Sequence, residues 1–555
     1  MPRLLPLALL AFALAPAAEA QATYRIAGTI VSAIDKHPLQ RASIQITNAD
    51  NAKQVQTTSS DEYGRFAFAK VLAGNFLLQG SATNYLTTLY NEHDGFTTGI
   101  VTGAAVDTES LALKLQPESA IGGIVVNEAA EPVENAIVRL FFQSHAFGDS
   151  RLVPAGTAPT DDRGRFELPH LKAGTYFVAV SASPWYAVHP LPQNDPPPSR
   201  PQTARAQQQQ KRVPPSGIAD AIDPTLDVAY ATEFYPGTTD TKHAQPIVLR
   251  GGDSPELHFQ LAPQVAVSVT IPRGALKQGQ PDVPPQLRIS IFGQLEMPPP
   301  SVMQQSSAQT VIAGLAPGDY MLTDPRSPNQ AHGGTPLHLT EQSTEAKLAA
   351  DSGLAHVHVI ARPADGSSAL SGLSVALAHS HSAEIISAEA DPKGEFTLDA
   401  SPGDYFFQIA GRGKALFPRE ILNGNQLLAN SKIHLAADDS RFYTVTYAEG
   451  THTLKGVVRK DGKGFPGAFI LLFPTSEAAD PHTFFRQQSD LDGSFTINGV
   501  APGAYTLLAI DGGWDLDWQQ SNALARFLPA AQKIGIPNTA EKTHFLTQSL
   551  AAQFR

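Results

Sequence analysis

A six-residue phrase, Asp-x-x-Gly-x-Phe, occurs four times in this 555-residue chain, and a Gly-x-aromatic step follows each copy. The copies are Asp61–Phe66, Asp161–Phe166, Asp391–Phe396 and Asp490–Phe495. Aspartate and glycine at these positions are typical of a tight turn in which glycine takes a positive φ, and the aromatic residue then returns to a core. A recurring unit of this kind predicts an array of similar small domains and not one large catalytic body.

Segments with alternating apolar residues flank these turns. Residues 265–271 place valine or isoleucine at every second position, and 111–115 and 257–261 do the same with leucine or phenylalanine. A period of two indicates a strand with one buried face. The chain has 43 Gly and 44 Pro, which mark turns between such segments. Each unit therefore has room for about seven short strands. The pattern predicts an all-β chain, built as a tandem array of about five antiparallel β-sandwich domains.

The spacing of the phrases divides the chain into five units. We place them at residues 23–117, 118–263, 264–350, 351–450 and 451–555. The third unit is degenerate, because it retains Gly314–Tyr320, which matches Gly499–Tyr505, but lacks the aspartate–glycine turn. The second unit carries a Pro/Gln-rich insertion at 190–215, whose composition cannot bury a core. We predict that this insertion is a disordered loop.

The first twenty residues have the features of a signal peptide. Arg3 precedes an apolar stretch, Leu4–Ala15, and Ala18 and Ala20 frame a cleavage site. A membrane anchor is the alternative, but this stretch is too short to span a bilayer. We therefore predict a signal peptide at 1–20, export to the periplasm or the cell exterior, and no integral membrane segment after cleavage.

Cysteine content and charge exclude several functions. The chain has no cysteine, so thiol catalysis and thiolate metal sites are excluded and each unit must depend on its own core. The formal net charge is −12. Nucleic acids and anionic membranes both require a basic surface, so we expect no nucleic-acid partner.

The turns and the strand openings resemble a known family. The openings Gly28–Ile30, Gly123–Val125 and Gly456–Val458, together with the four aspartate–glycine turns, resemble the carboxypeptidase regulatory-like domain, a transthyretin-like (prealbumin-like) sandwich. This fold is also similar to carbohydrate-binding-like and Cna-B-type modules. Tyr235–Thr238 resembles a phrase common in large bacterial exported members. The resemblance implies a non-catalytic role, because the domain is an appendage of zinc carboxypeptidases and fold alone implies no peptidase activity.

Histidines in the fourth unit suggest a metal site, which we weigh against ordinary surface. His381 and Glu384 have the His-x-x-Glu spacing of zinc carboxypeptidases, but they fall inside a sandwich repeat. His356 and His358 share one strand face and His379 lies on the next strand. If these strands formed a hairpin, some imidazoles could approach each other, but alternation turns His356 and His358 outward and His379 inward. We expect polar surface and no metal.

The turn acids are the other potential cation ligands. Asp490 with Asp492, and Asp161 with Asp162, could offer oxygen atoms to calcium. Further acidic ligands are not evident nearby, so we interpret these residues as turn formers. We predict no cofactor and no catalytic residues.

Aromatic residues after two strands are the candidate ligand-binding residues. Trp514 and Trp518 follow the last Gly-x-Tyr strand, and Trp185 with Tyr186 follows the equivalent strand of the second unit. Sugar rings stack on rigidly held aromatic faces, and sandwich modules commonly bind through such loops. Packing of these loops against their own domains is the favoured alternative.

The sequence therefore predicts an exported, non-catalytic, multi-domain protein for binding, adhesion or spacing, with a carbohydrate as the leading ligand. Two alternatives remain: a non-catalytic accessory to an envelope peptidase or hydrolase, and an outer-membrane receptor-associated protein. The expected partner is a polysaccharide or an envelope or extracellular protein. The oligomeric state is left open.

Overall fold

The computed structural model describes residues 22–103, 106–146, 148–191, 223–273, 283–299, 301–306, 308–323, 334–340, 344–346, 354–367, 372–379, 385–391, 393–411, 416–428, 432–475, 483–520 and 522–555. The predicted signal peptide, most of the predicted insertion, and His381 with Glu384 lie outside these residues. The described segments form strands, turns and short 3₁₀ helices, which confirms the all-β prediction. None of them is a helix long and apolar enough to cross a membrane.

The first sandwich has two sheets, in the orders β4-β1-β8 and β3-β2-β5-β6, with β7 also paired to β5. Its strands are β1 (Tyr24–Ser32), β2 (Ser43–Asn48), β3 (Val55–Ser59), β4 (Arg65–Val71), β5 (Gly74–Ser81), β6 (Thr88–Leu89), β7 (Ile100–Thr102) and β8 (Leu111–Leu115).

The second sandwich repeats this plan with sheets β12-β9-β17 and β11-β10-β13-β15, and β16 pairs with β13. Its strands are β9 (Ser119–Val126), β10 (Ile137–Ser144), β11 (Arg151–Pro159), β12 (Arg165–Leu171), β13 (Gly174–Ser181), β14 (Val228–Tyr230), β15 (Glu233–Phe234), β16 (Ile247–Leu249) and β17 (Glu256–Gln260). β14 pairs with β18 (Pro263–Val265), at the start of the third sandwich.

The third sandwich has sheets β22-β23-β19-β26 and β21-β20-β24-β25, so it keeps the fold despite its missing turn phrase. Its further strands are β19 (Val267–Pro272), β20 (Gln286–Ile291), β21 (Gln294–Glu296), β22 (Val302–Gln305), β23 (Gln309–Leu315), β24 (Gly318–Thr323), β25 (Thr335–Leu339) and β26 (Thr344–Glu345).

The fourth sandwich has sheets β30-β27-β35-β32-β33 and β29-β28-β31-β34. Its strands are β27 (Ala355–Pro363), β28 (Leu373–His379), β29 (Ile385–Glu389), β30 (Glu395–Ala400), β31 (Gly403–Gly411), β32 (Leu416–Asn423), β33 (Gln426–Leu427), β34 (Lys432–Leu435) and β35 (Ser440–Glu449).

In the fifth sandwich, β44 pairs with both β36 and β41, so the two layers join into one nine-stranded sheet. Its strands are β36 (His452–Lys460), β37 (Lys463–Gly464), β38 (Phe469–Pro474), β39 (Phe485–Gln488), β40 (Ser494–Val500), β41 (Gly503–Asp511), β42 (Gln532–Ile536), β43 (Thr543–Phe545) and β44 (Leu550–Phe554).

One feature of the pairing differs from the antiparallel prediction. The opening and closing strands of each sandwich are parallel neighbours, as in β1·β8, β9·β17, β19·β26, β27·β35 and β36·β44. The chain crosses between the two layers before it returns, so the closing strand meets the opening strand in the same direction. Alternation of apolar residues marks both strands but carries no information about their relative direction.

Each sandwich closes around its own apolar interior, and the repeated motifs serve that interior. The turn glycines Gly64, Gly164, Gly394 and Gly493 all have φ between 70° and 82°, as the phrase predicts. In four sandwiches the tyrosine of the Gly-x-Tyr step is buried, and its hydroxyl donates to the carbonyl four residues earlier. These bonds are Tyr176–Lys172, Tyr320–Ala316, Tyr405–Ser401 and Tyr505–Ala501, at 2.8–3.0 Å. The step therefore ties each core to its preceding turn.

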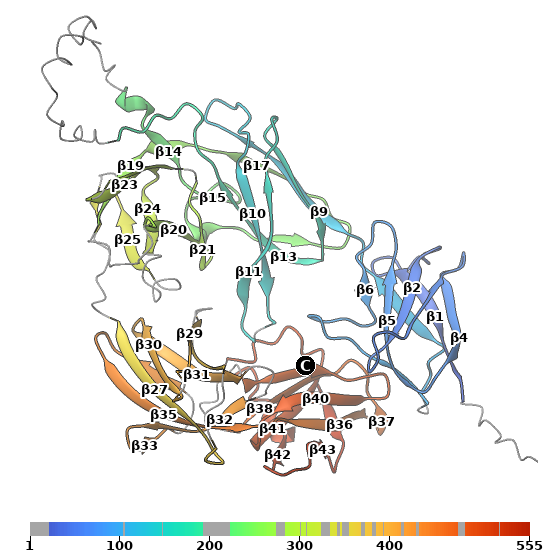
Figure 1. Cartoon of the computed structure of the whole chain (residues 1–555). Helices are drawn as coiled ribbons and strands as arrows, with labels where there is room; N and C mark the ends of the chain where they lie inside the picture. The colour runs from blue at the N-terminus through green and yellow to red at the C-terminus, as the bar shows by residue number, and fades with distance from the viewer. Residues whose placement is uncertain are drawn as a thin grey trace, which may run out of the picture.

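The chain folds back on itself, so that its last sandwich lies beside its first. Figure 1 shows the first sandwich (blue) next to the fifth (red), with the β10–β11 hairpin of the second sandwich reaching toward the fifth from above. Hydrogen bonds join the fifth sandwich to both: Leu491 N donates to Gly99 O at 2.9 Å, and Gln519 N donates to Gly148 O at 2.8 Å. Domains distant in sequence therefore meet at one junction.

Candidate functional site

The loop after β41 places its two tryptophans inside this junction. Trp514 and Trp518 are 8% and 6% exposed. The indole of Trp514 stacks on His93 of the first sandwich, with ring centroids 5.2 Å apart and planes 5° apart. Trp518 stacks on Phe484 at 5.1 Å. The Trp514 ring therefore packs between the first and fifth sandwiches and the Trp518 ring packs on its own sandwich, and the assignment of both to a ligand stays a prediction.

Polar groups of the fifth sandwich hold the first sandwich beside this aromatic contact. Gln488 is 2% exposed, and its Nε2 donates to Asn91 O at 2.6 Å and to Thr98 Oγ1 at 2.8 Å. Asp490 accepts from Gly99 N at 2.9 Å and from Asn75 Nδ2 at 2.8 Å. We call Asn75, Gly99, Gln488 and Asp490, with the residues they bond, the docking surface.

Asp490 can bond the first sandwich because its carboxylate does not accept the backbone N–H groups of its own turn. In the three other turns, the first aspartate accepts the backbone N–H groups two and four residues later: Asp61 from Tyr63 and Arg65, Asp161 from Arg163 and Arg165, and Asp391 from Lys393 and Glu395. In the fourth turn, Asp492 instead accepts from Ser494 N at 2.9 Å. The second aspartate thus frees the carboxylate of Asp490 for docking.

The docking carboxylate is electrostatically perturbed. Burial raises the pKa of Asp490 to about 6, and the nearby Asp492 carboxylate acts in the same direction, although the N–H donors of Gly99 and Asn75 oppose the shift. Burial disfavours the charged form of a carboxyl group because water no longer solvates it. The docking surface therefore contains a group that changes protonation at mildly acidic pH.

The β10–β11 hairpin of the second sandwich provides the third side of the junction. His145 Nδ1 lies 2.8 Å from Asp517 Oδ1. A Cβ atom at Gly148 would lie 2.2 Å from the ring of Trp518, and this glycine has a φ of 81°. Both the close approach and the backbone conformation therefore require glycine at this position.

Trp185 and Tyr186 lie away from the junction. Trp185 is 82% exposed, and its ring meets that of Tyr186 edge-on, with centroids 5.8 Å apart. The hydroxyl of Tyr186 donates to Glu128, which also accepts from the hydroxyl of Tyr230 at 2.9 Å. Burial, followed by the bond to the Glu128 carboxylate, raises the pKa of Tyr186 to about 12. Trp514 and Trp518 are therefore enclosed, whereas Trp185 is open to solvent beside a half-buried Tyr186.

The candidate metal ligands are dispersed. β27 and β28 belong to different sheets, so the hairpin that would bring the histidines of the fourth sandwich together does not form. His356 pairs with Asp399 at 2.6 Å, His358 stacks on Phe442 and His379 meets Tyr405 edge-on. Among the residues that the structure describes, no three histidine or carboxylate groups are placed to hold a metal ion.

Sequence reasoning missed the docking surface, although one signal was present. Asp490-x-Asp492-Gly493 is the copy of the phrase that has an additional aspartate next to its glycine and serine after it. That departure could have marked a turn whose first carboxylate is free for another task. The partner groups, Gly99 and Asn75, give no signal, because ordinary loop and strand residues fill those positions.

Comparison with known families identifies the first sandwich. Residues 25–110 match the carboxypeptidase regulatory-like domain. This span contains β1–β7 and the first turn phrase, so the family resemblance is confirmed there. A search of curated proteins gives no match.

Comparison with solved structures gives matches of low identity. The Bacillus anthracis TIE protein is 9% identical, covering 95% of this chain and 74% of its own, with a TM-score of 0.17. A streptococcal ancillary pilin is 11% identical over 52% of this chain and 99% of its own, with a TM-score of 0.19. GBS52, a minor pilin of Streptococcus agalactiae, is 9% identical over 43% and 96%, with a TM-score of 0.21.

Proposed function

We propose that this protein is an exported, non-catalytic binding protein whose five sandwiches form a rigid platform for adhesion. The observation that carries the proposal is the docking of the fifth sandwich on the first and second. Gln488 and Asp490 bond five groups of the first sandwich, one of them His93 Nδ1, and Trp514 stacks on the His93 ring. Such contacts hold separate domains at fixed positions, which suits a multivalent binding surface.

The same docking favours a platform over a spacer. A spacer gains reach when its terminal domains lie far apart, whereas here the first and last sandwiches are in contact (Figure 1). Detachment of the fifth sandwich would expose the buried indole of Trp514, which stacks on His93 of the first sandwich, and exposure of apolar surface to water is unfavourable. The closed arrangement is therefore the one in which we expect binding to occur.

We propose a polysaccharide as the ligand, and the surface formed by Trp185 and Tyr186 as its contact. The indole of Trp185 is 82% exposed, an unusual state for a large aromatic ring in a protein surface. Glu128 fixes the hydroxyl of Tyr186, so the pair is rigid on one side. The exposed indole of Trp185 lies beside the Tyr186 side chain, whose orientation is fixed by its hydrogen bond. The indole can therefore stack against a sugar ring at little cost in conformational entropy.

A polysaccharide pull-down tests this proposal. The purified chain and its Trp185→Ala variant are passed over insoluble polysaccharides, and we expect the variant to lose about fivefold or more in affinity, by analogy with the ~1–3 kcal/mol of a base stacked on an aromatic side chain. Phe554→Ala is a matched control, because Phe554 is also exposed (80%) but lies on the fifth sandwich. Equal retention of all three proteins would contradict the assignment of Trp185.

Export is tested separately by fractionating cells that express the chain. We expect the protein in the periplasmic or extracellular fraction, without its first twenty residues. Co-purification from the envelope fraction would identify a peptidase or hydrolase partner if the accessory alternative holds. Recovery of the intact chain from the cytoplasm would contradict the proposal.

A further inference from the structure

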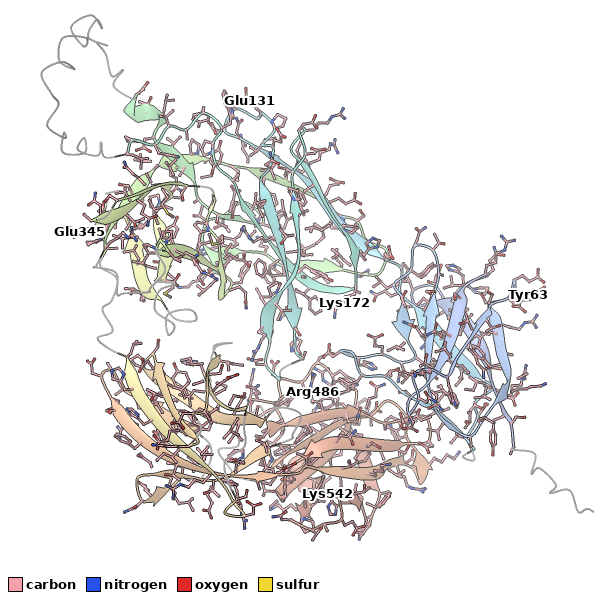
Figure 2. The ribbon with its side chains drawn as sticks, in the orientation of Figure 1. Tyr63, Glu131, Lys172, Glu345, Arg486 and Lys542 are labelled. Carbon is pink, nitrogen blue, oxygen red and sulfur yellow. The ribbon has the colours of Figure 1, made fainter. Side chains whose placement is uncertain are left out.

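A groove of about 670 Å³ lies between the first sandwich and the outer face of the fifth. We call it the interdomain groove. Asp50, Asn75 and Val101 of the first sandwich line one side, and strands β36, β40 and β43 of the fifth line the other. Figure 2 labels Lys542, which directly precedes β43, in the fifth sandwich, and Tyr63 in the first. The volume is within the range of sites that bind ligands, and neither sandwich forms the groove alone.

The register of these strands places three different side chains in one row of the groove. β36 pairs with β40 on one edge and with β43 on the other, so that Thr496, Lys455 and Phe545 are opposite one another. Directly opposite residues of neighbouring strands present their side chains on the same face of a sheet. All three residues line the groove. A hydroxyl, an ammonium and an aromatic ring are therefore side by side on a rigid sheet.

The ring of Phe545 is open to solvent. The residue is 69% exposed, and among the described residues no other ring stacks on it and no cation lies over it. The other strongly exposed phenylalanines are partly covered. Phe442 stacks on His358, with ring centroids 4.8 Å apart. The ammonium of Lys460 lies 5.9 Å from the centroid of the Phe554 ring. A bare aromatic face that is held by a strand suits stacking against the C–H face of a sugar ring.

The cations of the groove have no carboxylate partners among the described residues. The ammonium of Lys455 forms no hydrogen bond or ion pair with them, and Arg459 donates through Nη1 to Gly462 O at 2.7 Å but forms no ion pair. Both side chains are exposed and lie on the same face of β36, roughly 13 Å apart at the usual rise per residue of a strand. Of the acids that line the groove, Asp490 is bonded within the docking surface and Asp50 lies on the first sandwich.

Two separate positive charges favour an extended anion. A small anion contacts only one of them, whereas a chain with repeated negative charges contacts both and gains specificity from the match. Nucleic acids also carry repeated charges, but they require a broadly basic surface, and the formal net charge of this chain is −12. A polymer of lower charge density, with rings that stack on Phe545, fits the groove better.

We propose that the interdomain groove binds an acidic polysaccharide, whose sugar rings carry carboxylate groups. Lys455 and Arg459 pair with two of these carboxylates, and the Phe545 ring stacks on the sugar next to Lys455. The hydroxyl of Thr496 bonds a ring hydroxyl in the same row. This inference rests on the proposed binding function, because it names the charge class of the polysaccharide and a second contact for it. Since two sandwiches line the groove, the ligand favours the docked arrangement and stabilises it.

Binding of soluble polymers to the full chain tests the groove. Polygalacturonate and alginate are the acidic probes and dextran is the neutral one, measured by affinity electrophoresis and calorimetry. We expect both acidic polymers to bind more tightly than dextran, and to bind less tightly as salt screens their charges. In Lys455→Gln/Arg459→Gln, which removes both cations, the affinity for acidic polymers should fall roughly three- to tenfold and lose most of its dependence on salt.

Phe545→Ala tests the stacking contact independently of charge. The affinity for acidic polymers should fall about fivefold or more at both low and high ionic strength, by analogy with a base stacked on an aromatic side chain. Phe554→Ala is the matched control, because its ring is 80% exposed and does not line the groove. Unchanged affinity in either groove variant would overturn the proposal.

A second control separates the groove from net charge. Arg163→Gln/Lys393→Gln removes two exposed cations from the second and fourth sandwiches and should bind as the natural protein does. A loss equal to that of Lys455→Gln/Arg459→Gln would overturn the proposal, as would equal affinity of the natural protein for dextran and the acidic polymers. Tighter binding of single-stranded DNA than of either acidic polymer, lost in the same groove variant, would assign the groove to nucleic acid and also overturn it.

Comparison with Trp185→Ala separates this inference from the proposed function. Loss of acidic-polymer binding in Trp185→Ala, with unchanged binding in the groove variants, would overturn the groove and leave the proposed function standing. Loss in the groove variants alone would support the groove and contradict the contact proposed at Trp185 for these polymers. Failure of the natural protein to retain any polysaccharide, acidic or neutral, would overturn both proposals.

Discussion

At the scale of single residues, one carboxylate shows how a repeated motif acquires a new task. Asp61, Asp161 and Asp391 close their own turns, whereas Asp490 leaves that task to Asp492 and bonds the first sandwich. The backbone of the turn is unchanged, since Gly493 N still donates to Asp490 O at 2.8 Å. Docking has therefore been added to the turn without altering the fold of the fifth sandwich.

Gly99 is the residue on which this contact depends most directly. A Cβ atom there would lie 2.1 Å from Asn75 Oδ1 and 2.6 Å from Asp490 Oδ1. We expect Gly99→Ala to displace both side chains and weaken docking by about 1–3 kcal/mol, while each sandwich stays folded. Small-angle scattering should show a larger radius of gyration, and Trp514 fluorescence should shift to the red. An unchanged scattering curve, equal to that of Gly535→Ala, where a Cβ meets nothing within 4 Å, would show that the glycine is not required.

At the scale of elements, the strands and turns were accessible to sequence reasoning because each depends on local chemistry. Alternation at Val267–Ile271 and glycine at the turns specify strands and φ angles with no knowledge of the rest of the chain. The parallel pairing of β1 with β8 was not accessible, because it depends on how the chain crosses between layers. Packing of the Trp514 loop was the favoured interpretation, but its partner in another domain was not accessible, since His93, which covers Trp514, lies more than four hundred residues earlier.

The Gly-x-Tyr step of β41 can be tested as an element. Tyr505 is 6% exposed, its hydroxyl donates to Ala501 O at 2.8 Å, and burial raises its pKa to about 12, so the donor keeps its proton. Tyr505→Phe should cost about 1 kcal/mol and speed amide exchange in β40 and β41 by roughly fivefold, as hydrogen-exchange mass spectrometry would show. Unchanged exchange would mean that the ring alone holds the turn.

The corresponding hydrogen bond to the turn carbonyl can also be tested in the first sandwich. Phe76 stands where the other units have tyrosine, and the carbonyl of Leu72 instead accepts from Thr102 Oγ1 at 2.6 Å. A different strand thus supplies the hydroxyl that the aromatic residue lacks. We expect Thr102→Val to raise exchange at the start of β5 by a similar factor, whereas the exposed Thr57 on β3 gives a control, Thr57→Val, with no such effect.

At the scale of the whole molecule, the contacts close a linear repeat into a ring of sandwiches (Figure 1). In a chain whose neighbouring domains alone touched, each interface would couple only two adjacent domains. Here the fifth sandwich contacts the first and the second, so its detachment exposes groups on three domains at once. We therefore expect docking to be a distinct, cooperative step that can shift without unfolding any sandwich.

That step should depend on pH through Asp490. Its pKa is about 6 in the docked state, above the ordinary value near 3.8 that it regains on exposure. Because docking raises the pKa of this carboxyl group, the group favours the docked state most strongly when the pH is below the ordinary pKa. This contribution to the free energy of docking is lost as the pH rises through 6. Docking should thus strengthen between pH 7 and pH 4, by on the order of 2 kcal/mol. Asn75 Oδ1, which has no hydrogen-bond partner among the described residues, gives a protonated Asp490 carboxyl an acceptor after rotation of the Asn75 amide. In the natural protein, the radius of gyration should decrease as the pH is lowered across this range. It should stay constant in Asp490→Asn, whose side-chain amide keeps an acceptor for Gly99 N–H and carries no titrating proton.

Identical pH profiles for the two proteins would assign any transition to another group. His93, which bonds Gln488 across the same surface, would then be the next residue to replace.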